Sequence, residues 1–137
     1  MHRKILLWGL MLSLLSVVLG AFGAHALKNI VPAEKLAVFE TGVRYLFLHA
    51  FALIALGLYT QLNSTLLGVH KGLGWASNLF LLGILFFSGS LFLLTFQPLC
   101  TFNYSGIIGP ITPIGGLCFI LAWASWIRVV WSHKVDK

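Results

Sequence analysis

Residues 72–127 read GLGWASNLFLLGILFFSGSLFLLTFQPLCTFNYSGIIGPITPIGGLCFILAWASWI, and these 56 positions contain no Asp, Glu, Lys or Arg. A soluble domain of 137 residues has no interior large enough to bury such a stretch. The hydrocarbon core of a bilayer, in contrast, is about 30 Å thick and needs roughly 20 apolar residues for each helical crossing. The stretch is long enough for two crossings, and it predicts an integral membrane protein.

Composition points to the same class of protein. Hydrophobic residues make up 59% of the chain and charged residues 9%, against about 25% charged in an ordinary globular domain. The net charge of +6 would suit nucleic-acid binding in a soluble protein, but here Lys and Arg stand mostly beside apolar runs, where they set membrane topology. We therefore expect the lipid bilayer, and no nucleic acid, as a partner.

Four apolar segments are each long enough to cross the membrane, and they cover residues 5–24, 45–62, 73–96 and 113–131. The first one imitates a secretory signal peptide, because Arg3 and Lys4 precede it and small residues end it. A secretory apolar core has only about 7 to 15 residues, so we expect this segment to be a retained helix. The predicted fold is an all-α, four-transmembrane-helix bundle, a single domain over residues 1–137.

The distribution of Lys and Arg predicts the orientation of these helices. An even number of crossings places both termini on the same side of the membrane. The N-terminus, the second loop and the C-terminus carry six Lys and Arg, against three in the first loop. The excess of positive charge marks the cytoplasmic side. We therefore expect a multi-pass protein of the bacterial inner membrane with both termini in the cytoplasm.

The first loop, residues 27–44, has its own periodicity. Leu36, Phe39 and Val43 recur at i, i+3 and i+7 between charged positions, and Pro32 suits the first turn of a helix. This pattern predicts a short amphipathic helix that lies along the outer membrane interface between the first two spans.

Polar side chains gather near the outer ends of the predicted helices. Ionisable groups inside a membrane are costly, so each one is a candidate for function. The sequence predicts a polar outer-leaflet pocket that binds a small molecule, a lipid or a partner protein. Its candidate binding residues are His25, Glu40, Arg44, Tyr45, His49, Ser88, Ser90 and Thr112.

Structural explanations for the same residues stay open beside this one. Glu40 and Arg44 have the i, i+4 spacing of a helical ion pair. His49 lies one turn deeper than Tyr45 and needs a buried partner, which interhelical hydrogen bonding with His25 would supply. Ligand contact or proton transfer is the alternative for the two histidines.

The segment Gly109–Gly116 is rich in residues that start helices or allow close packing. Thr112 suits an N-cap and Pro113 the first helical position. A helix that begins below the membrane surface would favour an anion at its positive end, with Arg44 nearby. A tight turn whose glycines let helices approach closely is the other interpretation.

The sequence does not indicate an enzyme. There is no GxSxG motif, Ser88 and Ser90 have no evident base, and Glu34 and Glu40 are the only acids before Asp136. The histidines lack the tight spacing of metal ligands, and Cys100 and Cys118 form no CxxC pair. We expect no catalytic residue, no metal and no cofactor.

Two other functions remain as alternatives. A small transporter or proton-linked carrier would use His49 and Arg44, and with four helices it would need a second copy of the chain. The partner could equally be another membrane protein instead of a second copy of the chain. A membrane-bound redox or lipid enzyme is the third function, and it has the least support because no base, nucleophile and metal cluster occur together.

Four motifs in this order are similar to those of a known family: GAFGAHAL at residues 20–27, the pattern from Phe39 through Gly42 and Tyr45 to His49, FFSGSLFLL at residues 86–94, and GPITPIGG at residues 109–116. The chain resembles the YgdD/YwdK-like family of small four-helix membrane proteins, which has bacterial members and mitochondrial relatives. The resemblance covers residues 7–126 and implies the fold and the membrane location. It implies no activity, because the family's function is unknown.

Overall fold

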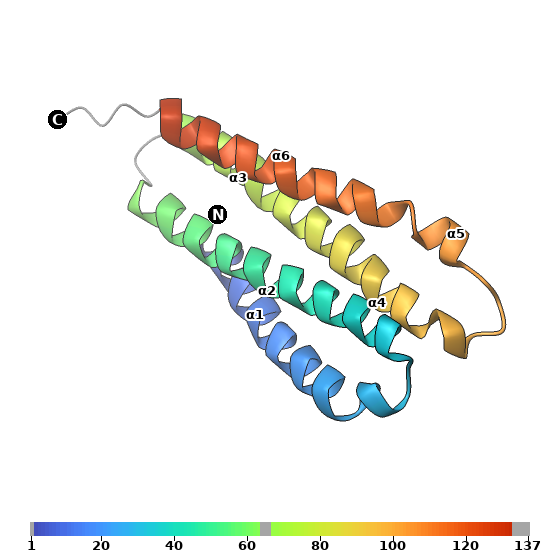
Figure 1. Ribbon diagram of the computed structural model, residues 1–137. Coiled ribbons are helices and arrows are strands. Elements are labelled where there is room, and N and C mark those ends of the chain that lie inside the picture. The colour runs from blue at the N-terminus through green and yellow to red at the C-terminus, as the bar shows by residue number, and fades with distance from the viewer. Residues whose placement is uncertain (1, 64–66, 133–137) are drawn as a thin grey trace.

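The computed structural model describes residues 2–63 and 67–132, and these residues form helices joined by short turns (Figure 1). The elements in chain order are α1 (His2–His25), η1 (Leu27–Asn29), α2 (Ala33–Leu62), α3 (Leu67–Gly83), η2 (Ile84–Ser88), α4 (Gly89–Phe96), η3 (Gln97–Leu99), α5 (Ser105–Ile108) and α6 (Ile111–Ser132). Four helical segments of the described chain are long and apolar enough to cross a membrane. The predicted all-α membrane fold with four spans is therefore confirmed.

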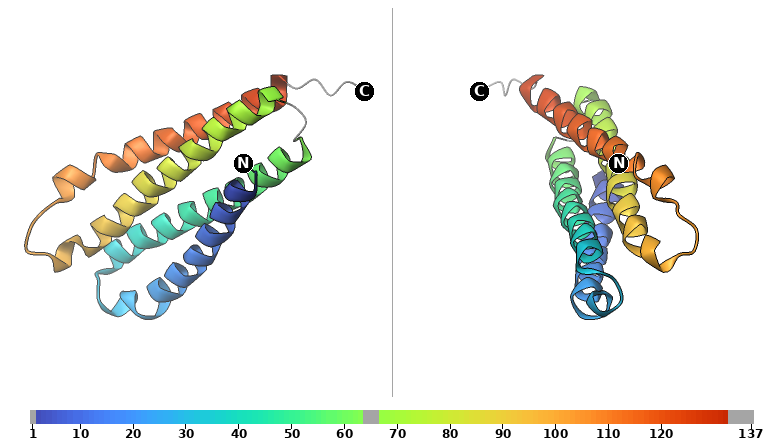
Figure 2. Two further views of the ribbon diagram at one scale, coloured as in Figure 1. Left: turned by 180° about the vertical axis from the view of Figure 1, so that it is seen from behind. Right: turned by 45° about the vertical axis from the view of Figure 1, so that its right-hand side comes forward.

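The helices form two antiparallel hairpins that lie side by side. In the first hairpin α1 packs along α2, and in the second α6 packs along α3, η2 and α4 (Figures 1 and 2). Helix α2 joins the hairpins because it also packs against α3, η2 and α4. In the most apolar 18 residues of each span, 44% are buried in α2 but only 17% in α1 and in α6. Helix α2 is thus the central helix, and α1 and α6 are peripheral.

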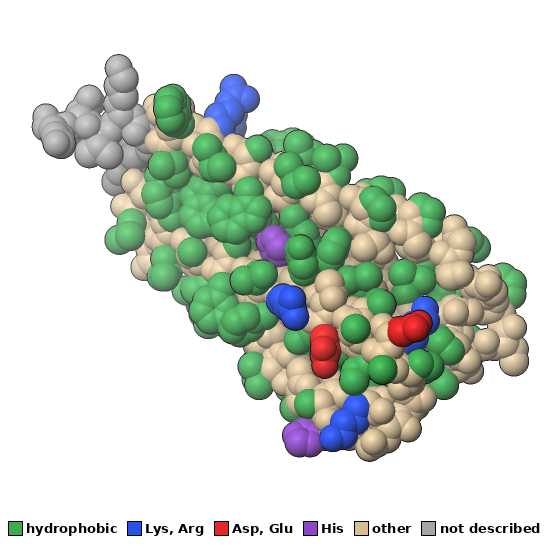
Figure 3. All heavy atoms as spheres, viewed as in Figure 1, with side chains coloured by type: hydrophobic (Ala, Val, Ile, Leu, Met, Phe, Trp, Pro, Cys, Tyr) green, Lys and Arg blue, Asp and Glu red, His purple; other side chains and the backbone are tan. Residues whose placement is uncertain are grey.

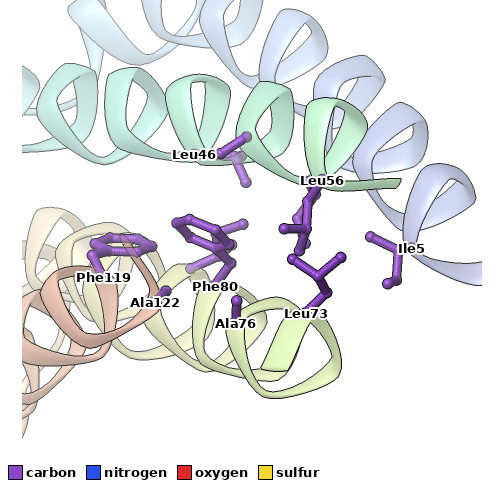
Figure 4. Packing of buried hydrophobic residues seen from close by; sticks show 11 residues of the cluster. Ile5, Leu46, Leu56, Leu73, Ala76, Phe80, Phe119 and Ala122 are labelled. Carbon is purple, nitrogen blue, oxygen red and sulfur yellow. The ribbon is translucent and has the colours of Figure 1, made fainter. Parts of the chain in front are cut away.

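Apolar side chains from all four spans meet between the hairpins. Figure 4 shows Leu46 and Leu56 of α2 pointing toward Leu73 and Phe80 of α3, with Ile5 of α1 at one end and Phe119 and Ala122 of α6 at the other. Lipid tails are as apolar as these side chains, so removal from water does not hold the helices together within a bilayer. Dispersion contacts in a closely packed core do this instead.

The first loop differs from its prediction. Residues 27–44 do not form a separate interfacial helix: η1 is a single short turn, and α2 then continues without a break from Ala33 to Leu62. Pro32 is the N-cap residue of α2, with φ −58° and ψ 151°. The periodic apolar face of the loop continues in register into the buried face of the span, which contains Leu46 and Leu53. One helix therefore serves both segments.

The third span also differs from the single regular helix predicted for residues 73–96. It is interrupted by η2, a π-helical turn of five residues. Such turns insert one extra residue into a helix and occur frequently at functional sites. Here the turn lies where α6 comes closest: a Cβ placed on Gly115 would be 2.8 Å from the carbonyl carbon of Phe86 and closer still to the backbone nitrogen of Phe87.

Candidate functional site

The eight predicted site residues do not line one pocket. Glu40 and Arg44 lie in a groove between α1 and α2, and Tyr45 and His49 belong to an aromatic cluster between α2 and α6. Ser90 and Thr112 bond to each other across α4 and α6. Ser88 is buried at the π-helical turn, and His25 is exposed at the end of α1.

The α1–α2 groove has a volume of about 260 Å³. Its lining residues are Ser16, Val17, Gly20 and Gly23 of α1 with Phe39, Glu40, Val43, Arg44 and Phe47 of α2. Small residues on α1 leave the space open, because a Cβ placed on Gly20 would meet only Val43, at 3.8 Å. The groove is thus apolar along its length, and its α2 wall carries one carboxylate, Glu40, and one guanidinium, Arg44.

The two charged residues of this groove do not form the predicted ion pair. Both Glu40 and Arg44 are exposed, and no ion pair occurs in the parts of the chain that the structure describes. An exposed i, i+4 pair gains only a few tenths of a kcal/mol, which does not hold two long side chains together. Figure 3 shows most of the charged side chains on this face gathered over the end where α1 meets α2. Both charges of the groove are therefore available to a ligand.

His49 is enclosed by aromatic rings. It is 6% exposed, and its ring stacks on Phe119 with centroids 3.5 Å apart and planes 5° apart. Tyr45, Phe80 and Trp123 lie around it, with ring centroids 5.9, 5.8 and 6.4 Å away. The ring fills the space between α2 and α6, so its shape contributes to the packing of the two hairpins.

The hydrogen bond of His49 stays within its own helix. Nδ1 lies 2.8 Å from the carbonyl oxygen of Tyr45, which can only accept, so Nδ1 donates. The predicted interhelical bond to His25 is wrong, because His25 is exposed at the far end of α1. The side chain of His49 contacts neighbouring helices through its ring faces and not through a polar bond.

This geometry predicts that the ring of His49 matters more than its nitrogens. The carbonyl of Tyr45 is also the i−4 acceptor for the backbone N–H of residue 49, so His49→Phe leaves it satisfied. We expect His49→Phe to change the free energy of unfolding by less than about 1 kcal/mol and His49→Ala to lower it by about 3 kcal/mol. Titration with dodecyl sulfate, followed by circular dichroism, measures both. An equal loss in the two variants would show that the nitrogens are essential.

Thr112 does not cap a helix. Helix α6 begins at Ile111, directly after α5 and a turn, and Thr112 lies inside its first turn. Its hydroxyl lies 2.7 Å from the hydroxyl of Ser90, which also donates to the carbonyl oxygen of Phe87 at 2.9 Å. Arg44, the predicted helper of an anion site, lies in the α1–α2 groove instead. The close contact at Gly115 favours the packing interpretation of the Gly109–Gly116 segment.

Two polar atoms in the described residues are buried without a hydrogen-bond partner: Oγ of Ser88 and Nε1 of Trp126. Ser88 is 1% exposed and lies in η2. The regular hydrogen bonding of the helix changes in this turn, and we attribute the lack of a partner for the Ser88 hydroxyl to that change. No group of three or more His, Cys, Asp or Glu that could hold a metal ion occurs in residues 2–63 and 67–132. The interior of the described chain therefore offers hydroxyls, one imidazole and the indole N–H of Trp126 as its polar side-chain groups.

The connection before α5 is held by its own side chains. The hydroxyl of Tyr104 donates to the carbonyl oxygen of Leu93 at 2.9 Å, and Oδ1 of Asn103 accepts from the backbone nitrogen of Ser105 at 3.0 Å. Desolvation, followed by the hydrogen bond with Cys100, raises the pKa of Tyr104 above its usual range. The phenol stays protonated and keeps its role as a donor.

The comparisons with known proteins agree with the motifs of the sequence. A family model described as a protein of unknown function, DUF423, matches residues 19–116. The chain belongs to the DUF423 family. The UPF0382 membrane protein of Staphylococcus saprophyticus is 36% identical to it over 133 residues, which are 97% of this chain and 99% of the relative. No solved structure matches the chain.

Two further relatives carry the names of the family that these motifs resemble. YwdK of Bacillus subtilis, a UPF0382 membrane protein, is 38% identical over 88% of this chain and 90% of its own length. YgdD of Escherichia coli, a UPF0382 inner membrane protein, is 30% identical over 89% of this chain and 85% of its own length. The DUF423 protein described here is therefore a membrane protein of a family whose function is unknown, and none of these relatives has an enzymatic name.

Proposed function

We propose that this protein is non-enzymatic and binds a glycerophospholipid with a zwitterionic headgroup, such as phosphatidylethanolamine, in the α1–α2 groove. The observation that carries the proposal is that Glu40 and Arg44 line one apolar groove, one helical turn apart, and are not paired with each other. A zwitterionic headgroup offers one charge to each. Phosphate accepts charge-assisted hydrogen bonds from a guanidinium, and an ammonium donates to a carboxylate.

The order of the two charges along α2 matches the order of charges in such a lipid. Helix α2 enters the membrane from Ala33, so Glu40 lies nearer the surface than Arg44, by about 6 Å at 1.5 Å per residue. In the lipid, the ammonium is outermost and the phosphate lies next to the glycerol and the acyl chains. Arg44 is thus level with the phosphate and Glu40 with the ammonium. Below them Val17 and Phe47 line the part of the groove that receives an acyl chain.

The location that fits this proposal is the inner membrane, with both termini in the cytoplasm and the α1–α2 groove in the outer leaflet. The excess of Lys and Arg on the side of the termini supports that orientation. The name of YgdD as an inner membrane protein supports the membrane. A carrier formed by several copies stays the alternative, with the buried His49 as the group that would move a proton.

Native mass spectrometry of the full chain, released from mild detergent with added phosphatidylethanolamine, tests the proposal. We expect one retained lipid per chain and, in Arg44→Gln, about tenfold weaker binding, which corresponds to about 1.4 kcal/mol. Glu40→Gln is expected to weaken the binding of phosphatidylethanolamine but not that of phosphatidylglycerol, which has no ammonium. Lys28→Gln is the matched control, because Lys28 is an exposed cation at the same end that does not line the groove.

Two results would contradict the proposal. Equal loss of lipid in Lys28→Gln and Arg44→Gln would mean general electrostatic attraction and no specific site. A protein that retains no lipid but appears as a discrete oligomer would favour the carrier instead, because the same spectrum reports the number of subunits.

A further inference from the structure

Helix α3 lies between two grooves at the end of the molecule opposite to Glu40 and Arg44. The α1–α3 groove has a volume of about 250 Å³ and is lined by Lys4, Ile5, Trp8, Leu53, Gly74, Ser77, Asn78 and Leu81. The α3–α6 groove has a volume of about 380 Å³ and is lined by Gly72, Trp75, Ser125, Arg128, Val129 and Ser132. Neither groove contains a residue of the predicted site.

The two grooves have the same set of side chains although they share no residue. Each has one cation, one tryptophan and two small polar groups: Lys4 and Trp8 with Ser77 and Asn78 in the first, Arg128 and Trp75 with Ser125 and Ser132 in the second. The tryptophan rings are 49% and 69% exposed. Tryptophan at this depth is typical of the boundary between hydrocarbon and headgroups.

Among the residues that the structure describes, the charge around these grooves has a single sign. Arg3, Lys4, Lys71 and Arg128 are exposed at this end, and both Glu residues of the described chain lie at the other end, in the first three turns of α2. Within the described part of the chain, a bound headgroup therefore meets cations and neutral polar groups but no carboxylate. This arrangement suits a phosphate and leaves an ammonium without a partner.

From this arrangement we infer that each of the two grooves beside α3 binds the headgroup of an anionic glycerophospholipid, with phosphatidylglycerol as the probe that fits. The phosphate bonds to Lys4 in one groove and to Arg128 in the other. The hydroxyls of Ser77 and Ser132 already donate to carbonyl oxygens of their own helices, so they accept from the glycerol of the headgroup, which also bonds to the Asn78 amide. The exposed tryptophan lies against the start of the acyl chains. Basic pockets between helices are a known setting for anionic headgroups.

The two ends of the molecule thus select different lipids by one chemical difference. The α1–α2 groove has a carboxylate beside its cation, and the grooves beside α3 do not. This inference does not depend on the proposed function, because no residue of the α1–α2 groove takes part.

Native mass spectrometry of the full chain with added phosphatidylglycerol or phosphatidylcholine is the test. We expect two phosphatidylglycerol molecules per chain at saturation. Phosphatidylcholine is compared in Arg44→Gln, which weakens the zwitterionic site between α1 and α2, and there we expect it to bind more weakly than phosphatidylglycerol. Lys4→Gln and Arg128→Gln should each weaken the binding of one lipid by about fivefold, the effect of one cation near a membrane surface. The double variant should weaken the binding of both.

Arg3→Gln is the matched control, because it removes the same charge from the neighbouring position, which lines neither groove. Loss of lipid in Arg3→Gln equal to that in Lys4→Gln would overturn the inference, as would equal binding of phosphatidylcholine. Displacement of the lipid by excess inorganic phosphate would overturn a lipid site in favour of a site for the free anion. Arg44→Gln should leave both phosphatidylglycerol molecules bound, so the two proposals fail independently.

Discussion

Gly115→Ala is expected to lower the free energy of unfolding by about 3 kcal/mol or more, because the added methyl group has no room. Its Cβ would contact the backbone of Phe86 and Phe87, which cannot rotate away as a side chain can. Helix α6 would have to move away from the π-helical turn η2, and it would lose contacts with η2 and with α3 and α4 on either side of that turn. Titration with dodecyl sulfate in mixed micelles, followed by circular dichroism, measures the loss.

Gly116→Ala is the control for this substitution. A Cβ at Gly116 would lie 3.8 Å from the ring of Phe87, an ordinary contact, so the same chemical change one residue later should cost less than about 1 kcal/mol. Alanine also favours the helix over glycine at both positions. Equal stability of the two variants would show that α6 does not approach η2 as closely as described.

Phe119→Ala is expected to have an effect of comparable size, a loss of about 3 to 5 kcal/mol in the free energy of unfolding. The ring is 4% exposed, stacks on His49 of α2 and lies 5.7 Å from the ring of Phe87 in η2. Its removal opens a cavity where α6 meets the other hairpin, and dispersion contacts are lost on several sides. The same titration measures the change, and the circular dichroism spectrum before titration shows whether the helices are retained.

Leu117→Ala provides the comparison on the same helix. Leu117 is 54% exposed, so in a bilayer its truncation exchanges contacts between the side chain and acyl chains for contacts among acyl chains. We expect a change of less than about 1 kcal/mol. A loss as large as that of Phe119→Ala would indicate that this face of α6 is covered by another protein and not by lipid.

The fold was predictable because a long stretch without charged side chains fits a lipid bilayer and does not fit a small soluble domain. Residues 72–127 fit a bilayer, and the four spans follow from their apolar length. The sequence does not predict a continuous α2, although the apolar period of Leu36, Phe39 and Val43 indicates a helix in this segment. An amphipathic pattern shows that a helix has a buried face, but not whether that face meets lipid headgroups or another helix such as α4.

The candidate site was predictable only in part. The sequence places polar residues at one end of the spans, and Glu40 and Arg44 do line a groove there. It does not show that His49 and Arg44 face different neighbours. They lie five residues apart on one helix, and which neighbour each faces depends on how α1 and α6 pack around α2. That packing is a property of the tertiary structure.

The grooves beside α3 were missed for a related reason. In the sequence, Lys4 and Arg128 belong to the Lys and Arg that predict membrane topology, and Trp8 and Trp75 stand near the ends of apolar segments. Lys4 lies near Trp8, and Arg128 near Trp75, in a groove that forms only when helices distant in sequence pack together, as α3 and α6 do. A cation and a tryptophan near the end of an apolar run occur in many membrane helices, so the pattern alone is not specific.

The π-helical turn makes the third span tolerant of losing one residue at that point. Because η2 contains one residue more than a regular helix needs, a chain that lacked a single residue there would form a regular α-helix that still reaches across the bilayer. The wide turn takes up the extra residue, so the helix after it would keep its orientation, and Ser90 and Thr95 would still face the partners they bond in α6 and α2. The same loss elsewhere in the span would turn everything after it by about 100° around the helix axis, so a gap between relatives is compatible with unchanged contacts between the hairpins at this turn and not elsewhere in the span.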